Sequence, residues 1–256
     1  WRIIRIHSNG SIRMIYDGTM AHQNGEASDD RQYGTGEFNS NCNDNMYVGY
    51  MYTKGEAHGT KTSSTIKTNV DKFYADKLSS YASKLDINVG FCGDRSTLNL
   101  QSGVGTGSVI TYNKGYLRVE ESSPTLTCEN ESDYYTISTA SSGNKSLSNS
   151  IGLITVDEVM LAGYAGGIFN GTYNYTKQNK NGYLVIGNSF HLMTPAGGYN
   201  PYGFFAFGSR VFAMYGTGKI DVYDTSNKLG LRPVINIRSD VTIIGTGTMT
   251  DPYLVN

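Results

Sequence analysis

From residue 183 to 255, short apolar segments alternate with Gly, Asn, Asp and Thr turns, and this pattern constrains the fold most. Segments this short, separated by turn residues, are typical of antiparallel strands rather than helices. The candidate strands are 183–186, 191–194, 204–207, 210–215, 219–223, 232–237, 241–244 and 253–255, the last two joined across a Gly/Thr turn. We therefore expect the C-terminal part of the chain to form β-sheet.

A β-hairpin is expected at the start of the chain. Residues 1–6 have an apolar strand pattern, and Asn9-Gly10 follows them. This dipeptide is the strongest short hairpin signal, because both residues tolerate a positive φ. Residues 11–16 then supply the return strand.

The clearest helical pattern lies between residues 63 and 85. Apolar side chains recur there at three- and four-residue steps and form one stripe, which predicts a core-facing helix. Ser63 or Ser64 can accept the hydrogen bond that caps its first turn.

A second helix is expected over 155–162, ended by Gly163, after a short buried strand at 151–154. Thr155 and Glu158 have the spacing of a capping box. Asp157 and Glu158 both fall in the first turn, where the helix dipole favours acidic side chains. That structural account explains the two carboxylates without acid–base catalysis.

Composition and charge exclude several classes of protein. With 21 Lys and Arg against 22 Asp and Glu, the net charge is -1, which argues against nucleic-acid binding as the main task. No apolar run approaches the roughly 20 residues of a membrane helix. The chain begins within a strand pattern and without Met, so we expect that an upstream leader or anchor segment is not included in it. Residues 1–256 are expected to form a single domain.

Three cysteines allow at most one internal disulfide. Cys92 and Cys128 bracket the Gly-rich loop 96–113, so a bridge between them would hold that loop. Cys42 would then pair with a cysteine upstream of the chain. The alternative is three buried free thiols in a cytosolic protein. The Tyr-, Asn-, Ser- and Gly-rich composition favours the disulfide and an extracellular location.

No metal site and no cofactor are expected. The sequence has no CxxC or HxxxH spacing, and none of its four histidines belongs to a ligand-spaced pair. It also lacks the GxSxG motif of a nucleophile elbow.

Residues 194–230 have the composition of an adaptable recognition surface. Tyrosine supplies large contact area at low entropic cost, and Asn and Ser supply adaptable hydrogen bonds. The same composition is also typical of an aromatic β-core with tyrosines on strand faces. The predicted contact residues are Tyr199, Asn200, Tyr202, Phe204, Arg210, Tyr215, Tyr223 and Asp224.

Nine segments spread over the chain form a recognisable set: WRIIRI at 1–6, FCGDRS at 91–96, PTLTC at 124–128, IGLITVDEV at 151–159, LMTP at 192–195, GLRPVIN at 230–236, SDVTI at 239–243, GTGT at 245–248 and DPYLV at 251–255. Taken together and in this order, they resemble a family of uncharacterised surface domains of gut-associated Gram-positive bacteria. Members of that family often follow a prepilin-like or membrane-anchor segment. The resemblance spans nearly the whole chain and implies a cell-surface location.

The closing GLRPV segment also resembles the end of the C-type-lectin-like fold, which is shared by formylglycine-generating-enzyme relatives and variable proteins of diversity-generating retroelements. This resemblance implies an α+β fold of twisted antiparallel sheets with two flanking helices and with the N- and C-terminal strands, 1–6 and 232–237, paired. In the variable proteins the diversified residues precede the terminal strands, where 194–230 lies here. The chain lacks the calcium-binding tripeptides of sugar-binding members and has no cysteine after Cys128.

These features favour a non-enzymatic cell-surface recognition or adhesion domain, with a binding face in 194–230 that could be diversified. Its partner would be a protein or glycan ligand on another cell or host surface, without nucleic acid, and with membrane attachment only through an upstream segment. Two alternatives stay open. One is a pilin-like structural subunit that binds copies of itself, and the other is a surface glycan hydrolase with two carboxylates in a cleft.

Overall fold

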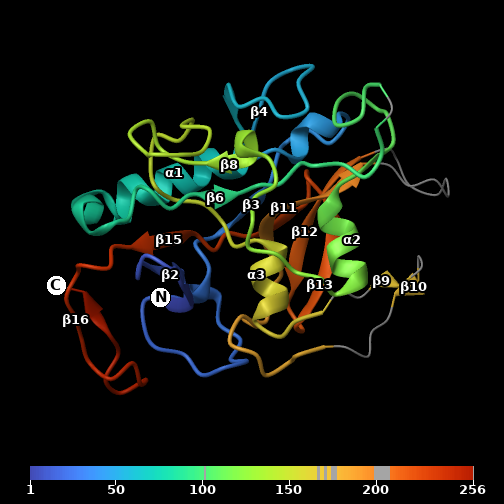
Figure 1. The fold of residues 1–256 in the computed structure, drawn as a ribbon. Helices are drawn as coiled ribbons and strands as arrows, with labels where there is room; N and C mark the ends of the chain where they lie inside the picture. The colour runs from blue at the N-terminus through green and yellow to red at the C-terminus, as the bar shows by residue number, and fades with distance from the viewer. Residues whose placement is uncertain (101, 166–167, 170–171, 174–177, 199–207, 256) are drawn as a thin grey trace.

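The computed structural model describes residues 1–256 apart from 101, 166–167, 170–171, 174–177, 199–207 and 256. The described chain has few helices and several antiparallel sheets (Figure 1). This arrangement confirms the expected α+β class.

The helices and strands have the following bounds. The α-helices are α1 (Thr65–Lys77), α2 (Lys114–Glu121) and α3 (Val156–Leu161), and 3-10 turns cover Asp29–Arg31, Asn45–Val48, Ser79–Lys84 and Glu131–Asp133. The longer strands are β1 (Arg2–Ile6), β2 (Ile12–Ile15), β3 (Thr35–Glu37), β11 (Phe190–Gly198), β12 (Ser209–Tyr215), β13 (Lys219–Asp224), β14 (Lys228–Gly230) and β15 (Val234–Ile237). Two-residue strands are β4 (Met51–Tyr52), β5 (Thr62–Ser63), β6 (Phe91–Cys92), β7 (Thr111–Tyr112), β8 (Tyr134–Tyr135), β9 (Ile168–Phe169), β10 (Thr172–Tyr173), β16 (Ile243–Ile244) and β17 (Leu254–Val255).

The N-terminal hairpin forms as predicted. β1 and β2 are antiparallel, and Gly10 adopts a φ of +82° in the turn between them, a region open to glycine. β15 pairs with the other edge of β2, so the order is β1-β2-β15. This corrects the expected pairing of the N- and C-terminal strands, since β2 lies between them. The reason is burial: β2 contains the fully buried Ile15, whereas β1 exposes Ile3 and Ile6 as an edge strand.

The larger sheet has the order β13-β12-β11-β14-β3, and β7 pairs with β11. It confirms the predicted strands at 191–194, 210–215 and 219–223. The predicted strand at 204–207 lies outside the described residues. The pair β16–β17 forms within the predicted segments 241–244 and 253–255.

Residues 183–186 do not form the predicted strand. Arg31 donates to the carbonyls of Tyr183 and Val185, at 3.0 and 2.9 Å, and Arg232 donates to the carbonyl between them. Guanidinium groups therefore take the acceptors that a neighbouring strand would have used.

The helix predicted over 63–85 forms, but it is shorter than the apolar pattern indicates, because the α-helix covers only Thr65–Lys77. Ser64 Oγ accepts from the N–H of Lys67, which confirms the cap. The α-helix ends at Lys77 and the chain continues as a 3-10 turn to Lys84.

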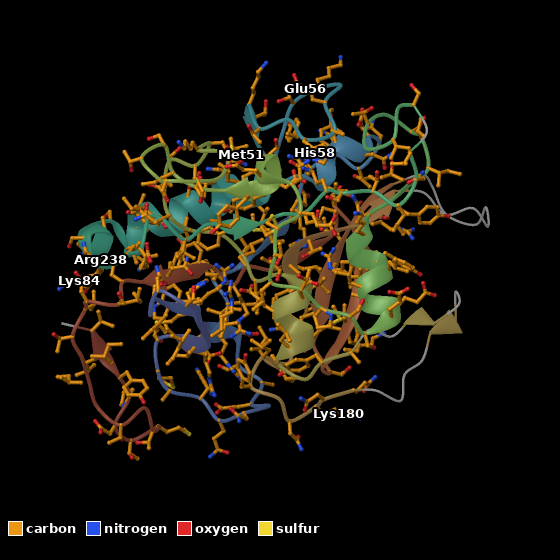
Figure 2. The ribbon with its side chains drawn as sticks, in the orientation of Figure 1. Met51, Glu56, His58, Lys84, Lys180 and Arg238 are labelled. Carbon is orange, nitrogen blue, oxygen red and sulfur yellow. A yellow bond between two sulfur atoms is a disulfide. The ribbon has the colours of Figure 1, made fainter. Side chains whose placement is uncertain are left out.

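Strand β15 draws the chain away from the helical path. Leu85 is buried and forms an isolated bridge with Ile237, and the carbonyl of Lys84 accepts from the N–H of Arg238 at 3.0 Å (Figure 2). Tyr81 falls within the predicted helix 63–85 but lies in the 3-10 turn that follows α1, and its side chain is exposed.

Helix α3 begins where the sequence predicts, with Thr155 as its N-cap. The preceding residues 151–154 are buried but make only an isolated bridge, Gly152 to Val234, instead of a strand. Helices α2 and α3 pack against each other and against β11 (Figure 1).

Helix α2 was not predicted from the sequence. Its buried residues are Gly115, Arg118 and Val119, so a charged side chain lies on its inner face. A Cβ at Gly115 would lie 2.7 Å from Thr194 Cγ2, which shows how closely α2 approaches β11. The helix has only eight residues, so its apolar pattern repeats too few times to distinguish it from a loop.

Candidate ligand-binding cavity

A polar cavity of about 370 Å³ opens between the small sheet, α2, α3 and the disulfide. It is lined by Arg5, His7, Arg13, Gly90, Cys92, Asp94, Arg118, Thr125, Leu126, Thr127, Cys128, Glu131, Tyr134, Ser142, Gly143, Thr155, Asp157, Glu158 and Thr194. Three arginines and four carboxylates share this lining. Charges at such a density are stable in a protein only when they are paired.

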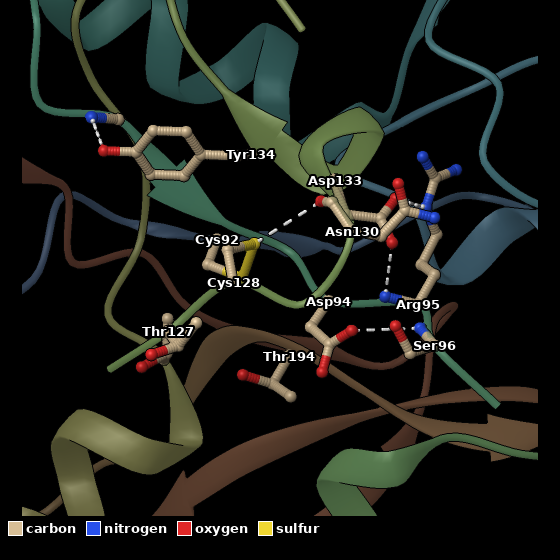
Figure 3. The surroundings of a disulfide bond; sticks show 12 residues. Cys92, Asp94, Arg95, Ser96, Thr127, Cys128, Asn130, Asp133, Tyr134 and Thr194 are labelled. Carbon is tan, nitrogen blue, oxygen red and sulfur yellow. Dashed lines mark hydrogen bonds and ion pairs between the residues drawn. A yellow bond between two sulfur atoms is a disulfide. The ribbon is translucent and has the colours of Figure 1, made fainter. Parts of the chain in front are cut away.

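The predicted disulfide forms one wall of the cavity (Figure 3). It joins Cys92, at the end of β6, to Cys128. The adjacent backbone is also held by α3, because Asp157 Oδ1 accepts from the N–H of Thr125 at 3.1 Å. The wall is therefore tied down at both ends. Cys42 is a free, half-buried thiol.

Two arginines meet at one carboxylate on the sheet side of the cavity. Arg5 and Arg13 lie directly opposite each other on β1 and β2, a pairing that would repel. Glu158 resolves it, because its Oε1 lies 2.9 Å from Arg5 Nε and 2.6 Å from Arg13 Nε. Burial alone would raise the pKa of Glu158, but Arg13, the Thr155 N–H and Arg5 together lower it. We call Arg5, Arg13 and Glu158 the basic cluster.

One arginine meets two carboxylates on the α2 side. Arg118 donates from Nε and Nη2 to the two oxygens of Asp157, at 2.7 and 3.0 Å, a bidentate arrangement. Its Nη1 donates to Asp94 Oδ2 at 2.9 Å. All three side chains are buried or nearly so. We call Arg118, Asp94 and Asp157 the acidic cluster.

His7 joins the basic cluster as a neutral imidazole. Arg5 can only donate, so His7 Nδ1 accepts from Arg5 Nη1 at 2.9 Å and the ring proton lies on Nε2. Nε2 then donates to Asn236 Oδ1 at 3.2 Å. Burial, followed by Arg5 and Arg13, lowers the pKa of His7.

Neutral hydrogen-bonding groups complete the lining. Thr127 and Thr194 lie around the same space beside the disulfide (Figure 3). Thr194 Oγ1 accepts from the N–H of Val156, which ties β11 to the first turn of α3. The Tyr134 hydroxyl accepts from the N–H of Gly90 at 2.7 Å.

None of the predicted recognition residues that the structure describes lines this cavity. Four of them, Tyr199, Asn200, Tyr202 and Phe204, lie outside the described residues. The other four, Arg210, Tyr215, Tyr223 and Asp224, lie on β12 and β13.

These four residues divide between the two faces of the hairpin. Arg210 and Asp224 are paired in register and form an ion pair at 2.9 Å, so the two polar groups bond to each other. Tyr215 and Tyr223 lie at alternate positions and therefore on the opposite face. Both tyrosines line a second hollow, together with Lys219 and Asp221.

One feature of the sequence indicates the cavity, although it does not enter the predictions above. Arg5 and Arg13 interrupt otherwise apolar strands, which is unusual unless a carboxylate meets them. The capping box and the helix dipole account for Asp157 and Glu158 at the level of sequence, but neither predicts that both carboxylates form ion pairs with arginines. The sequence gives no comparable indication that Arg118 lines the cavity, because helix α2 is not predicted from it.

Among the described residues, no group of three or more His, Cys, Asp or Glu side chains is arranged to hold a metal ion. No helix in the described part of the chain is long and apolar enough to cross a membrane.

Comparison with known proteins adds no family to this description. No protein-family model, no curated protein and no solved structure matches the chain.

Proposed function

We propose that this chain is a non-enzymatic extracellular recognition domain that holds its ligand in the polar cavity. The observation that carries the proposal is a concave site whose charged groups are already fixed by ion pairs on helices and strands. Small-molecule sites are typically largely pre-formed hollows of about 300–1,000 Å³ with a few convergent polar groups. The disulfide supports the extracellular location.

The partner we propose is a protein or glycan on another cell or host surface, whose end or side group enters the cavity. A C-type-lectin-like topology, which the GLRPV segment suggests, is part of this proposal.

The lowered pKa of Glu158 and its two arginine partners favour ligand binding over glycan hydrolysis as the function of the cavity. A glycosidase needs a carboxylic acid whose pKa is raised, so that it can donate a proton. Glu158 has the opposite shift and is held by two arginines. Asp94 and Asp157 share Arg118 as their ion-pair partner.

The test uses labelled protein on a printed array of glycans and short peptides. Thr127 is exposed and lines the cavity, so Thr127→Trp should fill the opening without disturbing the core. Thr62, exposed on β5 and away from the lining, gives the matched control Thr62→Trp. We expect the first variant to lose array binding and the second to keep it.

The array also tests the hairpin face. Loss of binding in a Tyr215→Ala, Tyr223→Ala double variant, with no loss in Thr127→Trp, would move the site to the β12–β13 hollow. An array to which the unmodified chain does not bind would contradict the proposal.

Self-assembly is a second candidate function, and exposed apolar side chains favour it. Ile3 and Ile6 are exposed on the edge strand β1, Ile244 and Leu254 are exposed on the C-terminal strand pair, and Tyr253 is exposed just before β17. Unpaired edges with apolar side chains can add further strands. Sedimentation velocity at rising concentration should then show oligomers that Ile6→Lys disperses, and a monomer at every concentration would exclude this candidate.

Diversification of 194–230 stays a separate proposal. Sequencing the locus in many isolates of one lineage should find changes concentrated in these codons. If residues 194–230 vary no more among the isolates than the surrounding strands do, diversification is overturned.

A further inference from the structure

The two charged clusters give the cavity opposite excess charge at its two sides. In the basic cluster two guanidinium groups share Glu158. In the acidic cluster two carboxylates share Arg118. The neutral His7 adds no charge to the first cluster. Within the lining, the exposed Glu131 adds one more carboxylate, whose Oε1 accepts from the N–H of Gly143.

The fold keeps the two clusters apart. Asp157 and Glu158 are consecutive in α3, and consecutive helical side chains diverge by about 100° around the axis. Asp157 therefore contacts α2, whereas Glu158 contacts β1 and β2. Helix α2 lies on one side of α3 and the β1–β2 hairpin lies on the other (Figure 1). The excess charges cannot neutralise each other by direct contact across the helix.

Both clusters contribute side chains to the cavity lining, but their exposure differs: Arg5 is partly exposed, whereas the Asp94 and Asp157 side chains are only 4% and 6% exposed. The Arg5 side chain is 26% exposed, whereas Arg13 is 1% exposed, so Arg5 is the cation that a ligand can reach. Among the described residues, Asp94 Oδ1 accepts from the N–H of Ser96 and Oδ2 accepts from Arg118. A carboxylate oxygen has room for a second hydrogen bond, so Asp94 can still accept from a donor in the cavity.

We propose that the ligand group held in this cavity is a small zwitterion, with its carboxylate beside Arg5 and its ammonium beside Asp94 and Asp157. This assignment rests on the proposed function and names the chemistry of its ligand. A zwitterion matches both excess charges at once, whereas a neutral sugar matches neither. A volume of about 370 Å³ suits a free amino acid or a short peptide with both termini free.

The experiment measures binding of the dipeptide alanyl-alanine to the oxidised chain by calorimetry, with amide NMR to locate it. Three further probes are its N-acetylated form, its C-terminal amide and methyl glucoside. We expect the free dipeptide to bind at millimolar concentration or tighter and to shift the amide signals of Thr127 and Asp94. Each blocked form should bind about tenfold more weakly or worse, because one charge-assisted contact is lost.

Two matched variants separate the zwitterion from general charge effects. Arg5→Gln should weaken alanyl-alanine binding about tenfold, while Glu158 keeps Arg13 as its partner. Arg2→Gln is the control, since Arg2 lies on the same strand, is 22% exposed and pairs with Asp17 outside the lining. It should leave binding unchanged.

The outcomes distinguish this inference from the proposed function. Equal binding of free and blocked dipeptides, or binding of methyl glucoside alone, would overturn the zwitterion and leave the cavity as a recognition site. No probe binding in the cavity, together with array binding that Thr127→Trp does not alter, would overturn both.

Discussion

Buried arginines organise much of the polar interior. Arg13, Arg31 and Arg232 are among the largest fully buried side chains. Each finds carboxylate or carbonyl acceptors, as a buried guanidinium must. Because one guanidinium can bond several segments at once, these single residues position loops that have no regular structure of their own.

His191 is buried in β11 and should make stability depend on pH. Its Nε2 donates to the carbonyl of Gly36 at 3.0 Å, and burial lowers its pKa from 6.5 to about 4. The unfolded chain therefore binds a proton first as pH falls, so stability is present above pH 6.5 and is lost toward pH 4. The full effect is roughly 3 kcal/mol. Urea unfolding measured across this range in the wild type and in His191→Gln should show a steeper loss in the wild type; parallel curves would contradict this prediction.

At the scale of the element, helix ends and cross-links fix the walls of the cavity. Helix α3 has only six residues, so its geometry depends on its cap and its contacts more than on intrinsic helix propensity. The disulfide likewise fixes the position of the segment that ends at Cys128.

The Thr155 cap should matter for both stability and the basic cluster. Thr155 Oγ1 accepts from the N–H of Glu158, and Glu158 Oε2 accepts from the N–H of Thr155. Thr155→Ala should cost about 1 kcal/mol in thermal unfolding, as loss of an N-cap usually does. Thr155→Ser keeps the hydroxyl and should stay close to the wild type. If both variants lose the same stability, the cap is not the cause.

Removal of the disulfide should destabilise the chain strongly. The closed loop spans 36 residues, for which chain entropy gives about 4 kcal/mol. A Cys92→Ser, Cys128→Ser double variant should therefore unfold at lower urea concentration and become insensitive to added reductant. Cys42→Ser is the control and should keep the wild-type midpoint, because that thiol is free.

At the scale of the whole molecule, one carboxylate joins distant parts of the chain. Asp17 pairs with Arg2, Arg31 and Arg232, at 2.7, 2.8 and 2.7 Å. Burial lowers the pKa of Arg232 to about 10, although Asp17 opposes that shift. The cluster connects the N-terminal hairpin, the 3-10 turn after it and the approach to β15.

Asp17→Asn should remove the common partner of these arginines. Breaking a buried ion pair from one side typically costs about 3–5 kcal/mol, because the remaining charge is left uncompensated. We expect a large fall in the denaturation midpoint. Asp240→Asn removes the exposed partner of Arg238 and should cause no measurable change. Equal effects of the two substitutions would contradict the assigned role of Asp17.

The sequence alone determined the features that depend on neighbouring residues. The turn at Asn9-Gly10, the Ser64 and Thr155 caps and the start of α1 all form as predicted, because their hydrogen bonds join residues a few positions apart. Cysteine position and overall composition favour a Cys92–Cys128 disulfide over three free thiols, and the structure confirms that bond.

Only the tertiary structure decided the rest. Arg5 and Glu158 are 153 positions apart, and no local pattern shows that they meet. The same holds for Arg118 in α2 and for the carbonyls that replace a strand at 183–186. The physical reason is that a periodic pattern records which face is apolar, whereas the partner of a buried charge depends on how distant segments pack.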